Sequence, residues 1–336
     1  MKVSSYNNFI ALAIVILIIP LFLTDCKKSE NPIKFPKGIF PDSIINLANI
    51  NSAYDDYNLA LYQLNAWKPI LFSSNRRSSG GQFDLEQASL SFIFDQTNGN
   101  FELEANMIND IFIDKLITKA NTPGNDFGPY NFFSSLDGFE YLLVSSVNDG
   151  GNLDLYYLKN RPYFGTNSPD ISGPNPVKLL NSSTDDAYIC FDSNLDSAYF
   201  ISNKDGNFDI YLHNRPAEKD IATWFDLEYA ASSKVDSINS SGDDKCPFIY
   251  RNIMIFTSDR SGGLGGFDLY YSVFRDGNWS SAVNLGPKIN SADNEYRPVI
   301  GYQPDYKNLY LMFSSDRPGG KGAFDLYFTG IEFPKK

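Results

Sequence analysis

One phrase of sequence returns five times along the chain, and this repetition limits the folds that are available to it. The fullest copy, FTSDRSGGLGGFDLYY at residues 256–271, has β-branched and aromatic residues on both sides of a glycine-rich turn, a pattern typical of strand, turn and strand. Close copies lie at 72–87 and 313–328, and weaker copies at 144–157 and 201–212. A nearly fixed period predicts a repeat architecture in which each copy belongs to one supersecondary unit. The aspartates near the ends of the five copies are Asp84, Asp154, Asp209, Asp268 and Asp325.

A second phrase, of the form Asn-[Ser/Thr]-x-x-[Asp/Asn]-[Asp/Glu], opens each unit with the same internal spacing. Its copies lie at 51–56, 121–126, 181–186, 239–244 and 290–295. After it we expect an inner strand, a tight hairpin, a second strand, the glycine turn, a third strand and then a return strand. The return strands are predicted at 113–118, 176–180, 225–230 and 279–285.

The two ends of the chain are expected to complete one another. The last unit stops after its third strand, near Ile331, and a strand-like piece at 43–47 precedes the first unit. That piece lies in DSIINLANINS, which closely matches SSAVNLGPKINS before the fifth unit. Joining them would close a ring and remove the open sheet edge. The sequence therefore predicts an all-β fold, a five-bladed β-propeller of four-stranded antiparallel blades, closed by an N-terminal strand that completes the last blade.

The N-terminal segment is typical of export. Lys2 precedes 15 apolar residues at 9–23, and a helix of that length spans about 22 Å, short of the roughly 30 Å hydrocarbon core. Leu-Thr-Asp-Cys, ending at Cys26, resembles a bacterial lipobox, which implies lipidation of Cys26. Because Asp25 replaces the small residue of that pattern, an uncleaved anchor and plain secretion stay open as alternatives. The predicted division is a lipoprotein signal peptide at 1–25, a tether at 26–38 and the propeller at 39–336.

Composition excludes several classes of function. The net charge of −12 argues against nucleic acid and anionic membrane surfaces as partners, since both require a basic face. His213 is the only histidine, which removes the common zinc sites and the Ser-His and Cys-His nucleophile pairs. Cys190 and Cys246 lie in apolar strand contexts and form either buried free thiols or a disulfide after export.

The five units resemble WD40-like β-propeller repeats of the TolB type, in which a strand is followed by Ser-Asp-Arg, a glycine turn and Asp-[Leu/Ile]-Tyr. The resemblance covers residues 40–331 and is greatest in units four and five. The GG-x-G-x-FDLY variant is similar to propeller segments of OmpA-family outer-membrane lipoproteins, although this chain lacks their peptidoglycan-binding domain. The resemblance implies a monomeric binding platform in a Gram-negative envelope, held at the outer membrane by its lipid and facing either the periplasm or the exterior.

Propeller geometry, as the resemblance implies it, would place the last acid of each opening phrase near the central channel. A ring of carboxylates could hold a cation or a basic peptide. Alternatively, each acid accepts backbone N–H bonds where the chain turns into its inner strand. The five acids are Asp56, Asp126, Asp186, Asp244 and Glu295.

Three arginines break the symmetry of the repeat. Arg76, Arg260 and Arg317 are equivalent, whereas the second and third units have Asn148 and Lys204 there. The three arginines would form an arc across neighbouring blades that meets a carboxylate-bearing partner. Alternatively, each arginine pairs with an acid of its own or the next unit. An extra hairpin-like piece at 89–109 is either a projecting partner contact or a decorated edge strand.

These features lead to one functional prediction and two alternatives. The prediction is a non-catalytic envelope lipoprotein that binds other, unidentified envelope proteins and needs no cofactor. One alternative is a glycosidase-like or carbohydrate-binding propeller that uses channel carboxylates, which in glycosidases work in pairs. The other is a propeller stabilised by calcium, bound by Asn148 and Asp149 with Asp154, or by Asp205 with Asp209.

Overall fold

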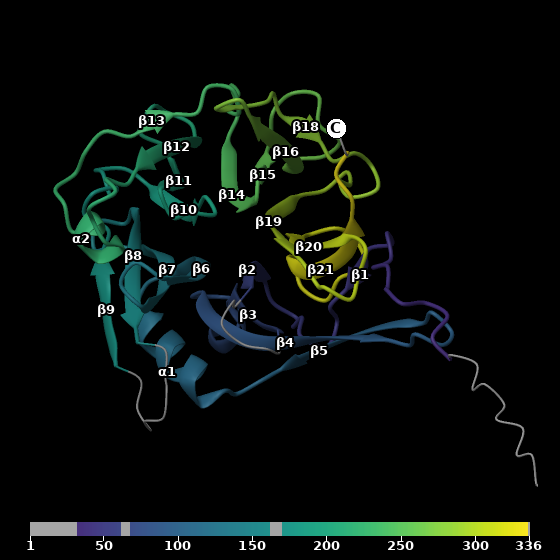
Figure 1. Cartoon of the computed structure of the whole chain (residues 1–336). Coiled ribbons are helices and arrows are strands. Elements are labelled where there is room, and N and C mark those ends of the chain that lie inside the picture. Colours follow the sequence, from purple (N-terminus) through teal and green to yellow (C-terminus); the bar gives the residue numbers. More distant parts are fainter. Residues whose placement is uncertain (1–31, 62–67, 162–169, 335–336) are drawn as a thin grey trace, which may run out of the picture.

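The computed structural model describes residues 32–61, 68–161 and 170–334. Within these residues, five antiparallel sheets stand around a central channel, one for each predicted unit (Figure 1). The predicted all-β, five-bladed propeller is confirmed. Its blades are numbered 1 to 5 in the order of their inner strands.

Each blade runs from the channel outward as inner, second, third and outer strand. The inner strands are β2 (Asp56–Leu61), β6 (Asp126–Ser134), β10 (Asp186–Phe191), β14 (Asp244–Tyr250) and β19 (Glu295–Gly301). The second strands are β3 (Lys68–Ser74), β7 (Phe139–Val147), β11 (Ser197–Ser202), β15 (Ile253–Ser258) and β20 (Leu309–Ser315). The third strands are β4 (Asp84–Phe94), β8 (Leu153–Asn160), β12 (Asp209–Asn214), β16 (Asp268–Arg275) and β21 (Asp325–Ile331). The outer strands are β5 (Phe101–Met107), β9 (Ile171–Pro176), β13 (Ser233–Lys234), β17 (Asn278–Trp279) with β18 (Val283–Asn284), and β1 (Ile45–Asn46).

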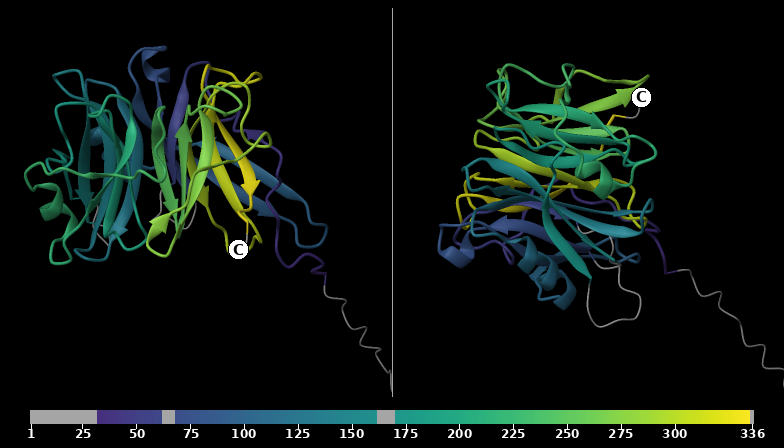
Figure 2. Two further views of the ribbon diagram at one scale, coloured as in Figure 1. Left: turned by 90° about the horizontal axis from the view of Figure 1, so that it is seen from above. Right: turned by 90° about the vertical axis from the view of Figure 1, so that its left-hand side faces the viewer.

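The strands run between two ends of the propeller, which are seen edge-on in Figure 2. We call the end that carries the Asn-[Ser/Thr] phrases and glycine turns the motif face. The opposite end, where inner and second strands are joined, is the hairpin face. The inner strands of neighbouring blades contact one another around the channel.

The N-terminal strand closes the ring as predicted. β1 pairs antiparallel with β21, with Ile45 opposite Phe328 and Asn46 opposite Tyr327, and Figure 1 shows the two strands side by side. The last blade therefore contains strands from both ends of the chain, which leaves no gap in the ring.

All five inner strands are irregular at the same place. Their register against the second strand shifts there, and the third residue of each has a positive φ between 49° and 58°. This bulge re-aims the third side chain and costs strain in any residue except glycine. The five residues are Asn58, Gly128, Tyr188, Cys246 and Arg297.

The outer strands were predicted least well. The segment 113–118 is not a strand but part of helix α1 (Ile111–Ala120), capped by Asp110. Its buried residues Ile113, Leu116, Ile117 and Ala120 follow the helical period, so the strand prediction was wrong and β5 is the outer strand instead.

The predictions at 225–230 and 176–180 were also wrong. The first overlaps helix α2 (Ile221–Phe225), whose Trp224 and Phe225 are fully buried, and the outer strand is β13. The second lies after the outer strand, because β9 ends at Pro176. The segment 279–285 holds most of β17 and β18, as expected.

The hairpin-like piece at 89–109 is the outer edge of blade 1, formed by β4 and β5. It also reaches blade 5, since the Phe92 and Phe101 rings contact Phe40 and Phe328. The hairpin thus supports the junction between the first and last blades. A short 3-10 turn, η1 (Arg76–Ser78), lies on the motif face after β3. Among the described residues, no helix is both long and apolar enough to span a bilayer.

Candidate functional site

The Asn-[Ser/Thr] phrase joins each blade to the one before it. The amide of its asparagine pairs with the backbone of a third strand: Asn290 Oδ1 accepts from Leu269 N at 2.8 Å, and Nδ2 donates to Leu269 O at 3.0 Å. Because the same hydrogen bonds recur at every junction, the phrase holds neighbouring blades together. The five pairs are Asn51 with Leu326, Asn121 with Leu85, Asn181 with Leu155, Asn239 with Ile210, and Asn290 with Leu269.

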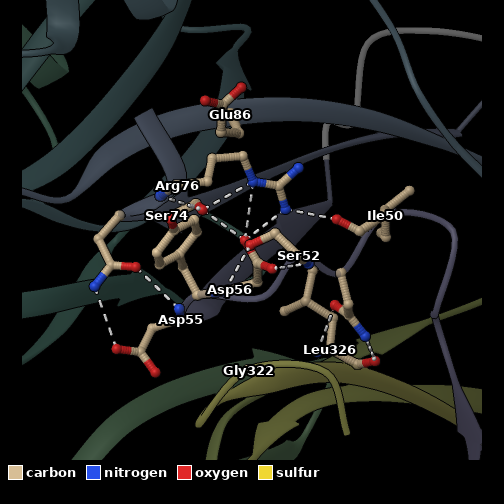
Figure 3. Close-up of polar contacts among 12 residues, drawn as sticks. Ile50, Ser52, Asp55, Asp56, Ser74, Arg76, Glu86, Gly322 and Leu326 are labelled. Atoms are coloured by element: carbon tan, nitrogen blue, oxygen red, sulfur yellow. Dashed lines mark hydrogen bonds and ion pairs between the residues drawn. The ribbon is translucent and has the colours of Figure 1, made fainter. Parts of the chain in front are cut away.

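The five acids of the phrase are at most 1% exposed. Figure 3 shows one of them: Asp56 accepts from Ser52 N and from Ser74 Oγ, both at 2.5 Å. The backbone N–H contact recurs in each blade at Asp126, Asp186, Asp244 and Glu295. The carboxylates are therefore bound within their own blades, and none of them lines the pockets described below.

Burial acts on the protonation of these acids. It raises the pKa of Asp126 to about 6, although bonds from Ser146 and Thr122 oppose the rise. It also raises the pKa of Asp186 and of Glu295. A buried carboxyl with a raised pKa binds its proton more tightly in the folded state.

The three arginines lie beside these acids on the motif face. Arg76 contacts Asp56 at 2.5 Å, Arg317 contacts Glu295 at 2.8 Å, and Arg260 pairs with Asp244. Their side chains are 14–19% exposed, and each donates to the backbone carbonyl of the residue before an opening phrase. Their binding of an external partner stays a prediction.

In blades 2 and 3, the described residues form no equivalent ion pair. Asn148 donates to Asp154 at 2.8 Å, and the Lys204 ammonium lies 3.9 Å from the centre of the Tyr211 ring. Asp205 accepts from the Tyr211 hydroxyl at 2.6 Å, and Asp209 pairs with Lys234. Within the described ranges, no three His, Cys, Asp or Glu side chains group as metal ligands. The calcium alternative stays a prediction.

A pocket with a volume of about 680 Å³ lies on the hairpin face. It is built where the inner strands end and their hairpins begin. Aromatic side chains dominate its wall, including Tyr130, Phe191, Tyr250 and Tyr302. Its volume and lining are typical of a small-molecule site.

Two charged side chains line this hairpin-face pocket. Asp192 is half-buried, and its Oδ1 accepts from Asp196 N at 2.8 Å and Ser197 N at 3.2 Å. Arg251 is exposed and its guanidinium lies 5.2 Å from the centre of the Tyr250 ring. The pocket therefore combines ring faces with one carboxylate and one cation. Sequence reasoning missed it because its residues, which lie near strand ends and in hairpins, are outside both repeated phrases.

The motif face has a smaller pocket of about 240 Å³ at the mouth of the channel. Its wall is formed by Tyr57, Tyr188, Phe267, Tyr296, Phe324 and Asn294. None of these side chains is charged, and burial raises the pKa of the Tyr57, Tyr188 and Tyr296 phenols. This mouth therefore offers stacking but no acid–base group at neutral pH.

Of the three cysteines, two lie in the described part of the chain. Cys190 and Cys246 are buried free thiols, and burial raises the pKa of both, that of Cys246 to about 12. They are protonated at neutral pH and unreactive as nucleophiles. Cys26, the predicted site of lipidation, lies outside the described residues.

Comparisons with known proteins identify the fold. No family model matches the sequence, and no curated protein matches it. A solved thermostable family-43 glycoside hydrolase is similar over 85% of this chain and 93% of its own, with 11% identity and a TM-score of 0.51. A family-43 β-xylosidase/α-arabinofuranosidase from a compost microbial metagenome, solved with xylotriose, is similar over 88% and 95%, with 10% identity and a TM-score of 0.50. At such identity the likeness shows the five-bladed fold.

These matches correct the family resemblance drawn from the sequence. The matched structures are glycoside hydrolases rather than TolB-type or OmpA-family lipoproteins. The non-catalytic protein-binding scaffold, with no enzyme activity, was inferred from that resemblance and was wrong with it. The physical reason lies in the phrases themselves, whose asparagines and acids are used to build and join blades. Such phrases report a propeller and not a family.

Proposed function

We propose that this protein is a carbohydrate-acting propeller of the glycoside hydrolase type, with its saccharide site in the hairpin-face pocket. The observation that carries the proposal is the pocket itself: about 680 Å³, walled by aromatic rings, with Asp192 and Arg251 as its charged groups. Pyranose and furanose rings present apolar C–H faces that stack on such rings, while their hydroxyls bond to carboxylates and guanidinium groups.

The solved relatives support the choice of ligand. Both solved structures named above are glycoside hydrolases, and one was solved with xylotriose. We therefore expect a short pentose oligosaccharide to bind, with Tyr250 or Tyr302 beneath one sugar ring and Asp192 accepting from a sugar hydroxyl.

Asp192 is the group of this pocket that can exchange a proton with a glycosidic oxygen. The usual hydrolytic route needs two carboxyl groups, about 5–5.5 Å apart for retention or 6.5–9.5 Å for inversion. Asp192 is the one carboxyl among the described residues that line the pocket. Binding and hydrolysis are therefore measured separately.

Binding is tested by calorimetric titration of the purified protein with xylotriose, arabinotriose and cellotriose. We expect at least one of these to bind, and Tyr302→Ala to weaken its binding about tenfold, the effect of losing about 1.4 kcal/mol of stacking. Tyr229→Ala is the matched control, because Tyr229 is similarly exposed, at 48% against 43% for Tyr302, and lies outside the pocket wall. Failure of all three ligands to bind, or equal affinity in the Tyr302→Ala variant, would refute the site.

Hydrolysis is tested by release of reducing sugar from arabinan and arabinoxylan. We expect the activity of the wild type to be lost in Asp192→Asn, which keeps the shape of the side chain and removes its proton-transfer function. The binding titration of the same variant separates loss of chemistry from loss of affinity. Activity that survives in Asp192→Asn would exclude this carboxylate as the reacting group.

We also propose that the protein is exported and held at the outer membrane by a lipid on Cys26. The apolar run and the lipobox-like tetrapeptide support this. Metabolic labelling with a radioactive fatty acid tests it, since wild type should incorporate label and Cys26→Ala should not. Label in both, or in neither, would contradict the anchor.

A further inference from the structure

Arg297 lies in the channel at the level of the five inner-strand bulges, which we call the waist. It is the third residue of β19, has a φ of 49° and is 0% exposed. Its Nη2 donates across the channel to Pro129 O at 3.0 Å and to Gly128 O at 3.5 Å. Its guanidinium also lies 5.5 Å from the centre of the Tyr188 ring. The side chain therefore spans from blade 5 to blades 2 and 3.

The charge of Arg297 has no counterion in the described part of the chain. Arg297 makes no ion pair there, and its Nε and Nη1 have no hydrogen-bond partner. In contrast, Arg76, Arg260 and Arg317 each pair with a buried carboxylate. A buried cation without a partner is strongly unfavourable.

The titratable groups around Arg297 do not supply a negative charge. Its electrostatic influence is felt by Tyr130, Tyr188, Cys190 and Cys246. Burial raises the pKa of each of them, so the phenols and thiols stay protonated at neutral pH. Among the described residues, these groups therefore leave the charge of Arg297 unpaired.

Hydrogen-bond donors remain free at the waist. Asn58 Nδ2 donates to the Tyr188 hydroxyl oxygen at 3.2 Å, which leaves the phenolic proton of Tyr188 available. With Nε and Nη1 of Arg297, the waist thus offers three donors and one fixed positive charge. Asn58 Oδ1 is a buried acceptor without a partner, which suits a water molecule next to the bound group.

We propose that the channel waist binds a small monovalent anion of the halide class against Arg297. Water alone would satisfy the free N–H groups but leave the charge unpaired, whereas a halide supplies the charge and accepts from N–H and O–H donors in any direction. The site is separate from the hairpin-face pocket, whose wall does not include Arg297. A bound anion would tie together residues of blades 3 and 5.

The first experiment locates the ion. Crystals of the wild-type protein are grown in sodium bromide, and anomalous scattering is recorded at the bromine edge. We expect a peak in contact with Nε or Nη1 of Arg297. A waist that holds only water, with no anomalous peak there, overturns the proposal.

The second experiment measures how the stability of the fold depends on chloride concentration. Thermal unfolding is followed while chloride replaces gluconate at constant ionic strength. Above the dissociation constant, each tenfold increase in chloride multiplies the folded-to-unfolded ratio about tenfold, which we expect to raise the Tm by about 3 °C. A Tm that does not depend on chloride overturns the proposal.

Matched variants assign the effect to the waist. Arg297→Met removes the charge and keeps an apolar chain of similar length, so we expect its Tm to be independent of chloride. Arg317→Met, in the same blade, removes a cation that is paired with Glu295 and should keep the chloride response despite a lower Tm. A response that survives in Arg297→Met places the ion elsewhere and overturns the proposal. Should Arg297→Met fail to fold, the bromide position in wild-type crystals decides.

Discussion

The role of the Asn-[Ser/Thr] phrase in holding neighbouring blades together can be tested at the junction that closes the ring. Asn51 is 5% exposed. Its Oδ1 accepts from Leu326 N at 2.9 Å, and its Nδ2 donates to Leu326 O at 3.0 Å and to Asn46 Oδ1 at 2.9 Å. Asn51→Ala removes all three bonds.

The expected loss of unfolding free energy depends on which hydrogen bonds the partners of Asn51 keep in the variant. Leu326 O still accepts from Leu47 N at 2.9 Å, so its carbonyl stays bonded. Leu326 N loses the partner shown here and becomes a buried, unsatisfied donor, which costs about 1–3 kcal/mol. With about 1 kcal/mol for the other lost bonds, we expect unfolding free energy to fall by about 3 kcal/mol.

The assay is equilibrium unfolding in urea, followed by circular dichroism. Asn290→Ala should lose a similar amount, because Asn290 makes the equivalent bonds to Leu269. The control is Asn278→Ala, since Asn278 is exposed and, among the described residues, its side chain bonds only to the nearby Asp276 O. Losses below about 0.5 kcal/mol in both test variants, the level typical of surface changes, would refute the reasoning.

Two further predictions concern the buried acids. Burial raises the Asp126 pKa from 3.8 to about 6. The contribution of Asp126 to stability is therefore full below about pH 4 and is lost as the pH rises through 6. The Asp126→Asn variant should lack this pH dependence, which amounts to about 2–3 kcal/mol. Parallel Tm profiles of wild type and variant between pH 4 and 7.5 would contradict it. Arg260→Met leaves Asp244 buried without its cation and should destabilise the fold by about 2–3 kcal/mol. Adding Asp244→Asn should restore part of that loss in urea unfolding, and strict additivity of the two changes would show that the pair is not coupled.

The fold could be predicted from the sequence because its decisive contacts are local to the repeated phrases. The glycine turn before Asp268 fixes a hairpin, and Asn290 fixes the next blade against it. Closure could be predicted as well, because β1 lies in a copy of the sequence that leads into another opening phrase. Each of these signals recurs from unit to unit, although the asparagine and its partner lie between 21 and 36 residues apart at the four junctions within the chain.

The outer strands could not be predicted because the chain leaves the repeat there. Residues at the rim have one neighbour strand and much exposed surface, so short strands such as β13, helix α1 and helix α2 all cover the same edge. Ile113 and Ile117 are β-branched, which favours a strand, but their helical spacing with Leu116 decides in favour of α1. Period is the better guide when the two signals conflict.

The candidate pocket could not be predicted for a different reason. Tyr130, Asp192, Tyr250 and Tyr302 belong to four different blades. No spacing along the chain relates them, and their convergence depends on the ring as a whole. Asp192 in particular lies in a turn whose sequence indicates only a hairpin.

The five residues at the waist share one backbone conformation but differ in residue type, which points to a role beyond the fold. All five have the same strained backbone, with φ between 49° and 58°, a conformation that costs of order 1 kcal/mol or more in a residue other than glycine. Glycine at every blade would remove that strain, yet only Gly128 is a glycine. Asn58, Tyr188, Cys246 and Arg297 must therefore return at least this energy through contacts across the channel. For Arg297 the contacts within the described chain fall short, because two of its nitrogens and its charge are unmatched. A bound anion would supply the missing hydrogen bonds and negative charge.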